Sequence, residues 1–321
     1  MTKVIQVAVA IITKPNGEYL LASRPDGKGW AGWWEFPGGK IEKNETPEDA
    51  LTRELQEELG IMPALVQPWV KRRYDYPATH DAKAKTVLLH FYFVLEWQGE
   101  PKPLEGQVLA WQHPQQLNVS PVLPANAPVM HALSLPGVYA ISHAAEMGEA
   151  AFLAALQRQL QQGLKLIQIR EKQMDRVTLI AFIGKVRLLA KQYKARVLVN
   201  SDVVLAMELG LDGVHLPSKD LLQLKETPND LLVAASCHNA TELAHAQMLG
   251  LDFVTLSPVA ATLSHSGTTS LGWQVFATLV ENATIPVYAL GGMRANDLPQ
   301  ALSSGARGIA MQRAVWGITA I

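Results

Sequence analysis

Short runs of hydrophobic residues, separated by polar and turn-forming residues, extend along the whole chain, and their arrangement changes near residue 134. In the first part, alternating runs predict strands, and the turn signal at residues 14–17 predicts that the first two form a hairpin. One run with helical spacing, residues 47–59, lies between these strands, and a short helix is predicted at 114–117. The predicted strands are residues 4–12, 19–23, 65–76, 86–97 and 109–111.

After residue 134 the chain becomes a regular alternation of short β runs and amphipathic helical runs. Seven helical segments separate eight β runs, which is typical of a (β/α)8 TIM barrel with parallel strands. The tail after the last run is short, so a stunted closing helix is expected. The eight predicted strands are residues 138–141, 166–169, 196–200, 213–216, 232–235, 253–256, 287–290 and 308–311.

Prolines at positions 121, 124, 128 and 136 mark the change between the two patterns. A chain of 321 residues with 48% hydrophobic and 18% charged residues is expected to hold about two globular domains. We therefore predict an α/β protein with a domain at residues 1–133 and a second at residues 134–321.

Charge and cysteine content exclude several classes of protein. A formal net charge of −1 gives no basic face for duplex nucleic acid. A single cysteine, Cys237, cannot form an internal disulfide and fits a reducing compartment. No apolar run approaches the ~18 residues of a membrane span, and the first residues lead directly into a predicted strand without a signal peptide. A cytoplasmic protein with no membrane partner is expected.

The helical run at 47–59 carries the first candidate chemistry. Thr46 is a suitable N-cap, Pro47 fits the first helical position, and Gly60 ends the run. At helical spacing Glu54, Glu57 and Glu58 share one face. An acidic helix face is most often only solvated. A hard cation such as Mg2+ or Mn2+ would remove the repulsion between these carboxylates.

The longer pattern around this helix favours the metal site. Gly39 is followed by Glu45 and then by residues 53–61, which read Arg-Glu-Leu-Gln-Glu-Glu-Leu-Gly-Ile. This pattern resembles the Nudix box in full. Residues 35–42, 99–101, 105–107 and 124–129 also resemble MutT-type Nudix pyrophosphohydrolases, which hydrolyse 8-oxo-dGTP. The resemblance covers about residues 3–132 and implies a Nudix α/β/α sandwich acting on a nucleoside triphosphate.

The resemblance also implies roles for particular residues. Glu54 is the first candidate for the base that activates water and Glu105 the second, and Glu58 belongs to the same catalytic set. Arg53 is expected to orient a carboxylate. The implied metal ligands are the Gly39 carbonyl and the side chains of Glu54, Glu57, Glu58 and Glu105.

Nucleotide recognition is implied at Arg24, Phe36 and Asn126, and an asparagine amide can read the Hoogsteen edge of an oxidised guanine. The Asp-Arg pair of the family is replaced by Ala84-Lys85, so that Asp81 or Lys85 is left to compensate. The tryptophans at positions 30, 33 and 34 stay unassigned between core packing and base stacking.

The second half resembles the thiamine-phosphate synthase and TenI superfamily, over residues 137–316. The matching segments are 168–172, 212–216, 236–238, 285–293 and 305–310. Glycines at positions 291, 292, 305 and 308 lie in the seventh and eighth strand regions, where such barrels commonly cradle a phosphate with backbone N–H groups, so a phosphate site is predicted there. The implied ligand residues are Gln168, Arg170, Lys172, Asn200, His238, His265, Gly291 and Gly292.

Several positions of the barrel depart from the synthase pattern. Asn200 is followed by Ser201 where the synthases have an aspartate, and Asp202 is displaced by one position, whereas Asp220 is retained. Residues 262–265 read Thr-Leu-Ser-His, without the lysine that grips pyrophosphate. The tautomerase histidine is replaced by Ser257, which leaves His238 and His265 as substitutes.

Three hypotheses follow. The first is a Mg2+- or Mn2+-dependent 8-oxo-dGTP pyrophosphohydrolase joined to a barrel of altered activity. The second is a hydrolase of thiamine-pathway pyrophosphates. The third makes the barrel a module that binds a thiazole or thiamine phosphate, either without turnover or as a tautomerase.

Overall fold

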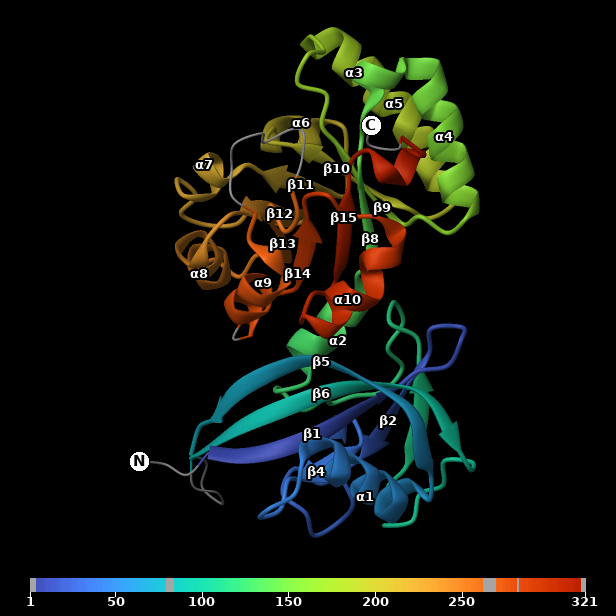
Figure 1. Ribbon diagram of the computed structural model, residues 1–321, viewed down its shortest axis with the longest axis vertical. Helices are drawn as coiled ribbons and strands as arrows, with labels where there is room; N and C mark the ends of the chain where they lie inside the picture. The colour runs from blue at the N-terminus through green and yellow to red at the C-terminus, as the bar shows by residue number, and fades with distance from the viewer. Residues whose placement is uncertain (1–3, 79–83, 262–269, 282, 319–321) are drawn as a thin grey trace. The chain divides into compact units, whose positions relative to one another are not determined.

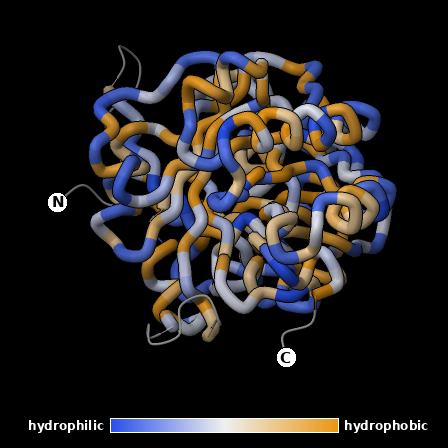
Figure 2. Tube along the Cα trace, turned by 90° about the horizontal axis from the view of Figure 1, so that it is seen from above, coloured by the Kyte–Doolittle hydropathy of each residue, from blue (hydrophilic) through white to orange (hydrophobic). Residues whose placement is uncertain are grey.

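The structure, a computed structural model, describes residues 4–78, 84–261, 270–281 and 283–318 (Figure 1). The chain divides into two compact units, Met1–Ser134 and Leu135–Ile321. Hydrophobic and hydrophilic stretches alternate along the Cα trace (Figure 2). Among the described residues, no helix combines the length and apolarity needed to cross a membrane.

Two sheets form the framework of the first unit. In the larger sheet β1 lies between β4, to which it is antiparallel, and β6, to which it is parallel, and β5 pairs with the far side of β6. The smaller sheet has the order β3-β2-β7. The strands are β1 (Val4–Ile12), β2 (Tyr19–Ser23), β3 (Trp34–Glu35), β4 (Gly38–Lys40), β5 (Met62–Tyr76), β6 (Lys85–Gln98) and β7 (Leu109–Gln112).

Two local predictions for this unit are wrong, and one helix was missed. Strands β1 and β2 are joined by the expected turn, in which Gly17 N–H donates to the Lys14 carbonyl at 2.9 Å, but they belong to different sheets rather than to one hairpin. One isolated antiparallel bridge, between Thr13 and Tyr19, joins the chain on either side of the turn, but β1 itself pairs with β4 and β6, and β2 with β3 and β7. Residues 114–117 form a turn closed by the His113–Gln116 bridge, not a helix. The helix α2 (Ala127–Ser134) was not predicted, although proline is tolerated in a first helical turn.

Helices cover both faces of the larger sheet, as the α/β/α prediction requires. Alternate residues of β1 point to opposite faces. Ala8, Ala10 and Ile12 pack in one buried cluster with the apolar side of α1 (Pro47–Leu59), whereas Val9 and Ile11 pack in another cluster with α2. The members contributed by the two helices are Ala50, Leu51, Leu55 and Leu59 from α1 and Val129, Met130 and Ala132 from α2.

The bounds of α1 confirm the sequence prediction. The Thr46 hydroxyl accepts the Asp49 N–H at 3.1 Å, and Pro47 follows at the first helical position. The helix ends at Gly60, whose φ of 67° is left-handed and whose N–H donates to the Gln56 carbonyl. The acidic side of α1 is thereby held in a fixed register against β4.

The second unit is a closed barrel of eight parallel strands, which confirms the predicted (β/α)8 architecture. Around the barrel each strand pairs with the next one in the chain, and β15 closes onto β8. The strands are β8 (Val138–Ile141), β9 (Leu166–Ile169), β10 (Arg196–Asn200), β11 (Gly213–Leu216), β12 (Leu232–Cys237), β13 (Phe253–Leu256), β14 (Val287–Leu290) and β15 (Gly308–Met311).

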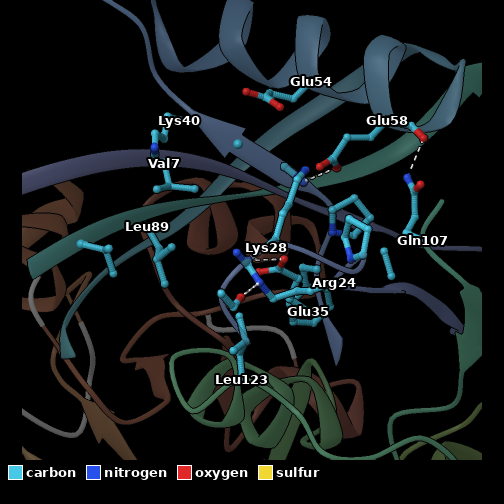
Figure 3. Close-up of a pocket in the computed structure, with 18 of the residues that line it drawn as sticks. Val7, Arg24, Lys28, Glu35, Lys40, Glu54, Glu58, Leu89, Gln107 and Leu123 are labelled. Carbon is cyan, nitrogen blue, oxygen red and sulfur yellow. Dashed lines mark hydrogen bonds and ion pairs between the residues drawn. The ribbon is translucent and has the colours of Figure 1, made fainter. Parts of the chain in front are cut away.

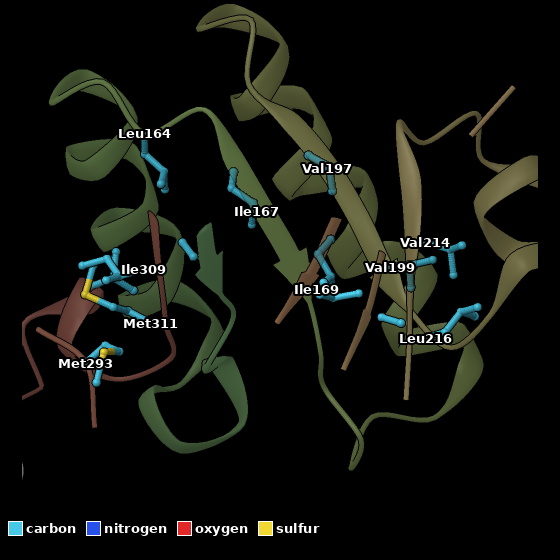
Figure 4. Packing of buried hydrophobic residues seen from close by; sticks show 14 of the residues in the cluster. Leu164, Ile167, Ile169, Val197, Val199, Val214, Leu216, Met293, Ile309 and Met311 are labelled. Atoms are coloured by element: carbon cyan, nitrogen blue, oxygen red, sulfur yellow. The ribbon is translucent and has the colours of Figure 1, made fainter. Parts of the chain in front are cut away.

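Alternation along these strands separates two cores. Inward residues such as Tyr139, Phe253 and Tyr288 fill the barrel, and outward residues such as Ile167 and Val199 pack under the helices (Figure 4). The closing element is only the 3-10 turn η3 (Ala314–Trp316), as the short tail predicted. The α-helices are α3 (Ala144–Met147), α4 (Glu149–Gln161), α5 (Arg176–Gln192), α6 (Val203–Glu208), α7 (Ser218–Leu221), α8 (Ala240–Met248), α9 (Gly272–Val280) and α10 (Leu298–Ser303).

Candidate active site

A cavity of about 600 Å³ opens in the first unit, where the loop after β2, the segment from β3 to β4 and the helix α1 meet (Figure 3). Acidic side chains gather toward α1, and apolar side chains such as Val7, Leu89 and Leu123 line another part of the wall. The charged lining residues are Glu35, Glu42, Glu54, Glu58, Glu105, Arg24, Lys28, Lys40 and Lys85.

Two glycines bring the backbone of β4 against the carboxylates of α1. A Cβ atom on Gly39 would lie only 2.0–2.2 Å from the Glu54 carboxylate, so no side chain fits at this position. The Gly38 N–H donates to Glu58 Oε2 at 3.1 Å. The structure therefore places the Gly39 backbone, Glu54 and Glu58 together, as the box pattern indicated.

Electrostatics at Glu58 shows that negative charge is concentrated here. The pKa of Glu58 is raised to about 7, mainly by burial and further by the nearby carboxylates of Glu54, Glu35 and Glu105, while the Gly38 hydrogen bond acts in the opposite direction. These oxygen donors suit a hard divalent cation, which would remove the repulsion. Among the described residues, however, no three acidic, histidine or cysteine side chains already converge in a ligand cluster, so binding requires rotamer changes.

Arg53 orients the carboxylates and has no donor left for a substrate. All five of its N–H groups are directed to protein acceptors. Two go to Glu45 at 2.9 and 3.0 Å, one to Glu54 at 2.9 Å, one to Glu57 at 3.2 Å and one to the Lys40 carbonyl at 3.1 Å. The Glu54 carboxylate is thus fixed between Arg53 and the Gly39 backbone.

Glu57 differs from its two neighbours on the helix. Its side chain is 56% exposed, pairs with Arg53 and is not among the residues that line the cavity. The structure therefore brings together Glu54 and Glu58 but leaves the third glutamate of the expected acidic face at the rim.

Glu105 reaches the cavity from the loop after β6. Its backbone N–H donates to Gln107 Oε1 at 2.7 Å, and the Gln107 amide donates to the Glu58 carbonyl at 2.7 Å. This buried glutamine ties the loop to the end of α1. The Glu105 side chain accepts from Lys28 Nζ at 2.6 Å. Neither Lys28 nor Gln107 was a predicted site residue, although the Glu-Gly-Gln sequence was a signal for Gln107.

The opposite part of the cavity carries the predicted nucleotide contacts. Arg24 donates to Glu35 and to the Gly29 carbonyl, both at 2.6 Å, beside the buried ring of Phe36. Lys85 Nζ lies 5.0 Å from the ring centroid of Tyr76, a distance suited to a cation–π contact. Desolvation raises the pKa of the half-buried Glu35.

Other residues of the predicted nucleotide site are placed differently. Asn126 is only 4% exposed at the start of α2, where its carbonyl accepts from Met130 N–H, and it does not line the cavity. Asp81 lies outside the described residues. The Trp30 and Trp33 rings meet edge to face at 4.7 Å, and Trp30 approaches Tyr76 at 6.1 Å.

In the barrel, the predicted ligand residues lie at the C-terminal ends of the strands. Gln168 Nε2 donates to Asn200 Oδ1 at 3.2 Å. Burial lowers the pKa of Arg170, and the charge of Arg170 is the largest cause that lowers the pKa of Lys172. Two cations held this close create a positive region suited to a phosphate ester.

The barrel carboxylates are already bound by protein donors. Asp202 caps α6, accepts the Leu205 N–H at 2.8 Å and pairs with Arg176 at 2.9 Å, so it does not replace the missing aspartate. Ser201 donates to Asp220 at 2.5 Å. Glu171 accepts from the Ser142 hydroxyl and from the N–H groups of Ala144 and Ala145.

Of the remaining predicted barrel residues, His238 follows β12 directly, and Gly291 and Gly292 follow β14. Gly291 and Gly292 have φ values of 102° and 70° and pack against the backbone near Pro258 and Ala260, where a Cβ would collide at 2.8–2.9 Å. His238 is exposed, and its N–H donates to Glu242. His265 lies outside the described residues.

A buried histidine lies on β11, with a hydrogen-bond partner at each ring nitrogen. His215 is 2% exposed inside the barrel, with Tyr139 Oη 3.1 Å from Nδ1 and Ser236 Oγ 2.9 Å from Nε2. Burial lowers its pKa to about 3, so the ring is neutral.

A mixed sheet between two helices with a carboxylate-rich cavity, followed by a closed parallel barrel, defines a two-domain α/β protein with a hydrolase-type acidic site. Residues 3–133 match the NUDIX domain family, and residues 138–315 match the thiamine monophosphate synthase family. The chain belongs to both families: an N-terminal MutT-like Nudix domain is fused to a C-terminal thiamine-phosphate synthase domain.

Individual relatives resemble one unit each. The first unit is 42% identical to an 8-oxo-dGTP diphosphatase of Escherichia coli over 40% of this chain and 95% of the relative. It is 37% identical to a CTP pyrophosphohydrolase of the same organism over 40% of this chain and 91% of the relative. The second unit is 35% identical to a putative thiamine-phosphate synthase 2 of Aquifex aeolicus over 56% of this chain and 96% of the relative.

Proposed function

We propose that the first unit hydrolyses 8-oxo-dGTP to 8-oxo-dGMP and pyrophosphate with the help of Mg2+ or Mn2+. The observation that carries this proposal is a single cavity with carboxylates at α1 and with Arg24, Phe36 and Tyr76 elsewhere in its wall. Such a cavity has room for a metal-bound phosphate chain beside a stacked base. The relation to an 8-oxo-dGTP diphosphatase supports the choice of nucleotide.

The residues proposed to hold the metal are the Gly39 carbonyl and the carboxylates of Glu54, Glu58 and Glu105, with Glu57 joining from the rim. A bound divalent cation would neutralise phosphate charge and lower the pKa of water. Glu54 is proposed to accept the proton of the attacking water, because Arg53 and the Gly39 backbone fix its carboxylate at the cavity wall. Glu105 is the second candidate for this role.

Arg24, Phe36 and Lys85 are proposed to contact the nucleotide, because all three line the cavity. Asn126 is proposed as the reader of the oxidised purine, although its buried side chain must turn to reach a base. An Asn126→Ala variant that discriminates 8-oxo-dGTP from dGTP as well as the parent protein would remove this role.

The substrate is tested by pyrophosphate release from a panel measured with Mg2+ and with Mn2+. The panel comprises 8-oxo-dGTP, dGTP, CTP, thiamine pyrophosphate and hydroxymethylpyrimidine pyrophosphate. We expect kcat/KM for 8-oxo-dGTP to exceed that for dGTP by at least about 10²-fold, equivalent to a few kcal/mol of specific hydrogen bonding. Equal values for the two nucleotides would defeat the specificity proposal.

A second candidate substrate class is favoured by two observations. Lys85, which replaces the family's Asp-Arg pair, lies over Tyr76 in the cavity, and the fusion partner is a thiamine-phosphate synthase domain. Hydrolysis of a thiamine-pathway pyrophosphate would follow from both. The same panel decides, since inactivity on both pyrophosphates removes this alternative.

For the barrel we propose binding of a thiazole or thiamine phosphate, with synthase activity lost or altered. The Ser201–Asp220 hydrogen bond supports this, because a carboxylate that the synthase pattern leaves for a metal is taken by a hydroxyl. Calorimetry of the full chain with thiamine phosphate is expected to show binding, while assays of thiamine phosphate formation stay blank. Turnover, including tautomerase turnover, would instead show altered chemistry.

A further inference from the structure

Lys28 lies among the carboxylates of the cavity, in the loop between β2 and β3 (Figure 3). Its ammonium group is 2.6 Å from Glu105 Oε2, slightly shorter than the ~2.7–2.9 Å usual for a charge-assisted hydrogen bond. A lysine side chain is a cation at neutral pH. A cation thus already lies beside Glu105, one of the proposed metal ligands.

We propose that Lys28 holds the Glu105 carboxylate until a divalent cation binds, and that the ammonium group it releases then contacts the phosphate chain of the substrate. The inference rests on the proposed pyrophosphohydrolase function, and it assigns a positioning residue and phosphate contact that the Nudix box does not contain.

The first half follows from competition for one carboxylate. A divalent cation that bound Glu105 would sit about 2.1–2.6 Å from a carboxylate oxygen. An ammonium group 2.6 Å from the same carboxylate would then lie within a few ångströms of a double positive charge. Repulsion at that separation is substantial even with partial solvent screening. Metal and ammonium therefore exclude each other at Glu105.

The second part of the proposal, the contact of Lys28 with the phosphate chain, depends on whether Lys28 or Glu105 moves when the metal binds. Glu105 is held by its backbone contact with Gln107, which is in turn bonded to the end of α1. Arg24, the neighbouring cation, is held at both Nε and Nη1 by Gly29 and Glu35. Lys28 has a flexible stem and a compact charge that reorients without a fixed geometry. It is therefore the cation that moves, and a triphosphate in the same cavity offers it new oxygen partners.

The test measures Mn2+ binding to the full chain without nucleotide, by electron paramagnetic resonance of free Mn2+. Side-chain exposures of 49% and 39% for Lys28 and Glu105 place their pair among weak, partly screened ion pairs. Lys28→Met is therefore expected to tighten Mn2+ binding only about two- to fivefold. The same variant should raise KM for the best nucleotide of the panel. Lys43→Met, an exposed lysine outside the cavity, is the matched control for loss of one positive charge.

The opposite signs of the two effects separate this role from a structural one, because a damaged site would bind both metal and nucleotide less well. In a Glu105→Gln background, Lys28→Met should no longer change Mn2+ affinity. Unchanged or weaker Mn2+ binding by Lys28→Met overturns the proposal, as does the absence of Mn2+ binding by the parent protein. Tighter Mn2+ binding with an unchanged KM overturns the phosphate contact. If 8-oxo-dGTP is not a substrate but the Mn2+ shift appears, only the proposed nucleotide specificity fails.

Discussion

Several carboxylates of the first unit line one cavity and lie within electrostatic reach of one another, whereas Glu171, Asp202 and Asp220 of the barrel are separately bound by donors of the protein. Burial is the main cause that raises the pKa of Glu58 to about 7; the charges of Glu54, Glu35 and Glu105 add to it, and the hydrogen bond from the Gly38 N–H opposes it. In the barrel, Glu171 accepts three hydrogen bonds, two of them from backbone N–H groups. Glu58 thus lies among like charges, whereas Glu171 is surrounded by hydrogen-bond donors.

This difference indicates which kind of ligand each site favours. A cluster of like charges is stabilised by an added cation, so the cavity of the first unit favours a divalent metal. A strand end with satisfied carboxylates, and with Arg170 and Lys172 nearby, favours an anion without a metal. The first site therefore favours a cation, and the barrel site favours a phosphate anion.

The largest expected effect is the loss of kcat when a carboxylate of the first unit's cavity is neutralised. Glu54→Gln keeps the size of the side chain but removes the proposed proton acceptor and metal ligand, so kcat for pyrophosphate release should fall by about 10³-fold. Stability should change little, because loss of the ion pair between Arg53 and Glu54 is offset by weaker repulsion around Glu58. Circular dichroism melting checks the fold, and Glu96→Gln, an exposed glutamate outside the cavity, is the control. A kcat within tenfold of the parent value would contradict the assignment of Glu54.

The next effect tests how completely the barrel satisfies its buried groups. The folded-state pKa of His215 is about 3 against an ordinary value of 6.5, so the unfolded chain binds the proton more tightly. This contribution to stability is present above pH 6.5 and is lost as the pH falls toward 3. Between pH 7 and pH 5 the barrel should lose about 2 kcal/mol, about thirtyfold in its unfolding equilibrium.

Hydrogen exchange of the full chain followed by mass spectrometry, corrected for intrinsic exchange rates, measures this loss separately in the barrel strands. A His215→Gln variant should be less stable at pH 7, because Tyr139 and Ser236 lose their partner, but its protection should depend less on pH. Equal pH dependence in parent and variant would show that His215 does not set it.

How far the sequence predicted these sites depends on the kind of contact involved. Contacts set by local spacing were predictable. Thr46 and Gly60 mark the two ends of α1, and Gly39 lies against Glu54 as the box pattern indicated. The barrel strands were equally clear, because each apolar run is short and bounded by turns.

Contacts that depend on tertiary packing were not predictable. The pairing of Lys28 with Glu105 joins residues 77 positions apart, and no local pattern records it. The exposure of Glu57 follows from how α1 sits on β4, since helical spacing alone gave it the same face as Glu54 and Glu58. The separation of β1 and β2 into two sheets likewise depends on β6, which follows some seventy residues later in the chain.

The smallest expected effect is a change in Mn2+ affinity, and one type of titration compares it at the two sites. Glu58→Gln should weaken Mn2+ binding by at least about tenfold, the loss typical even of residues that only support metal ligands. Asp220→Asn should leave the affinity unchanged, because Ser201 already donates to that carboxylate. Mn2+ titrations of the full-length variants, followed by electron paramagnetic resonance, measure both. If Asp220→Asn also weakened binding, the barrel would hold a cation as well, and its satisfied carboxylates would then have to exchange the hydroxyl of Ser201 for a metal.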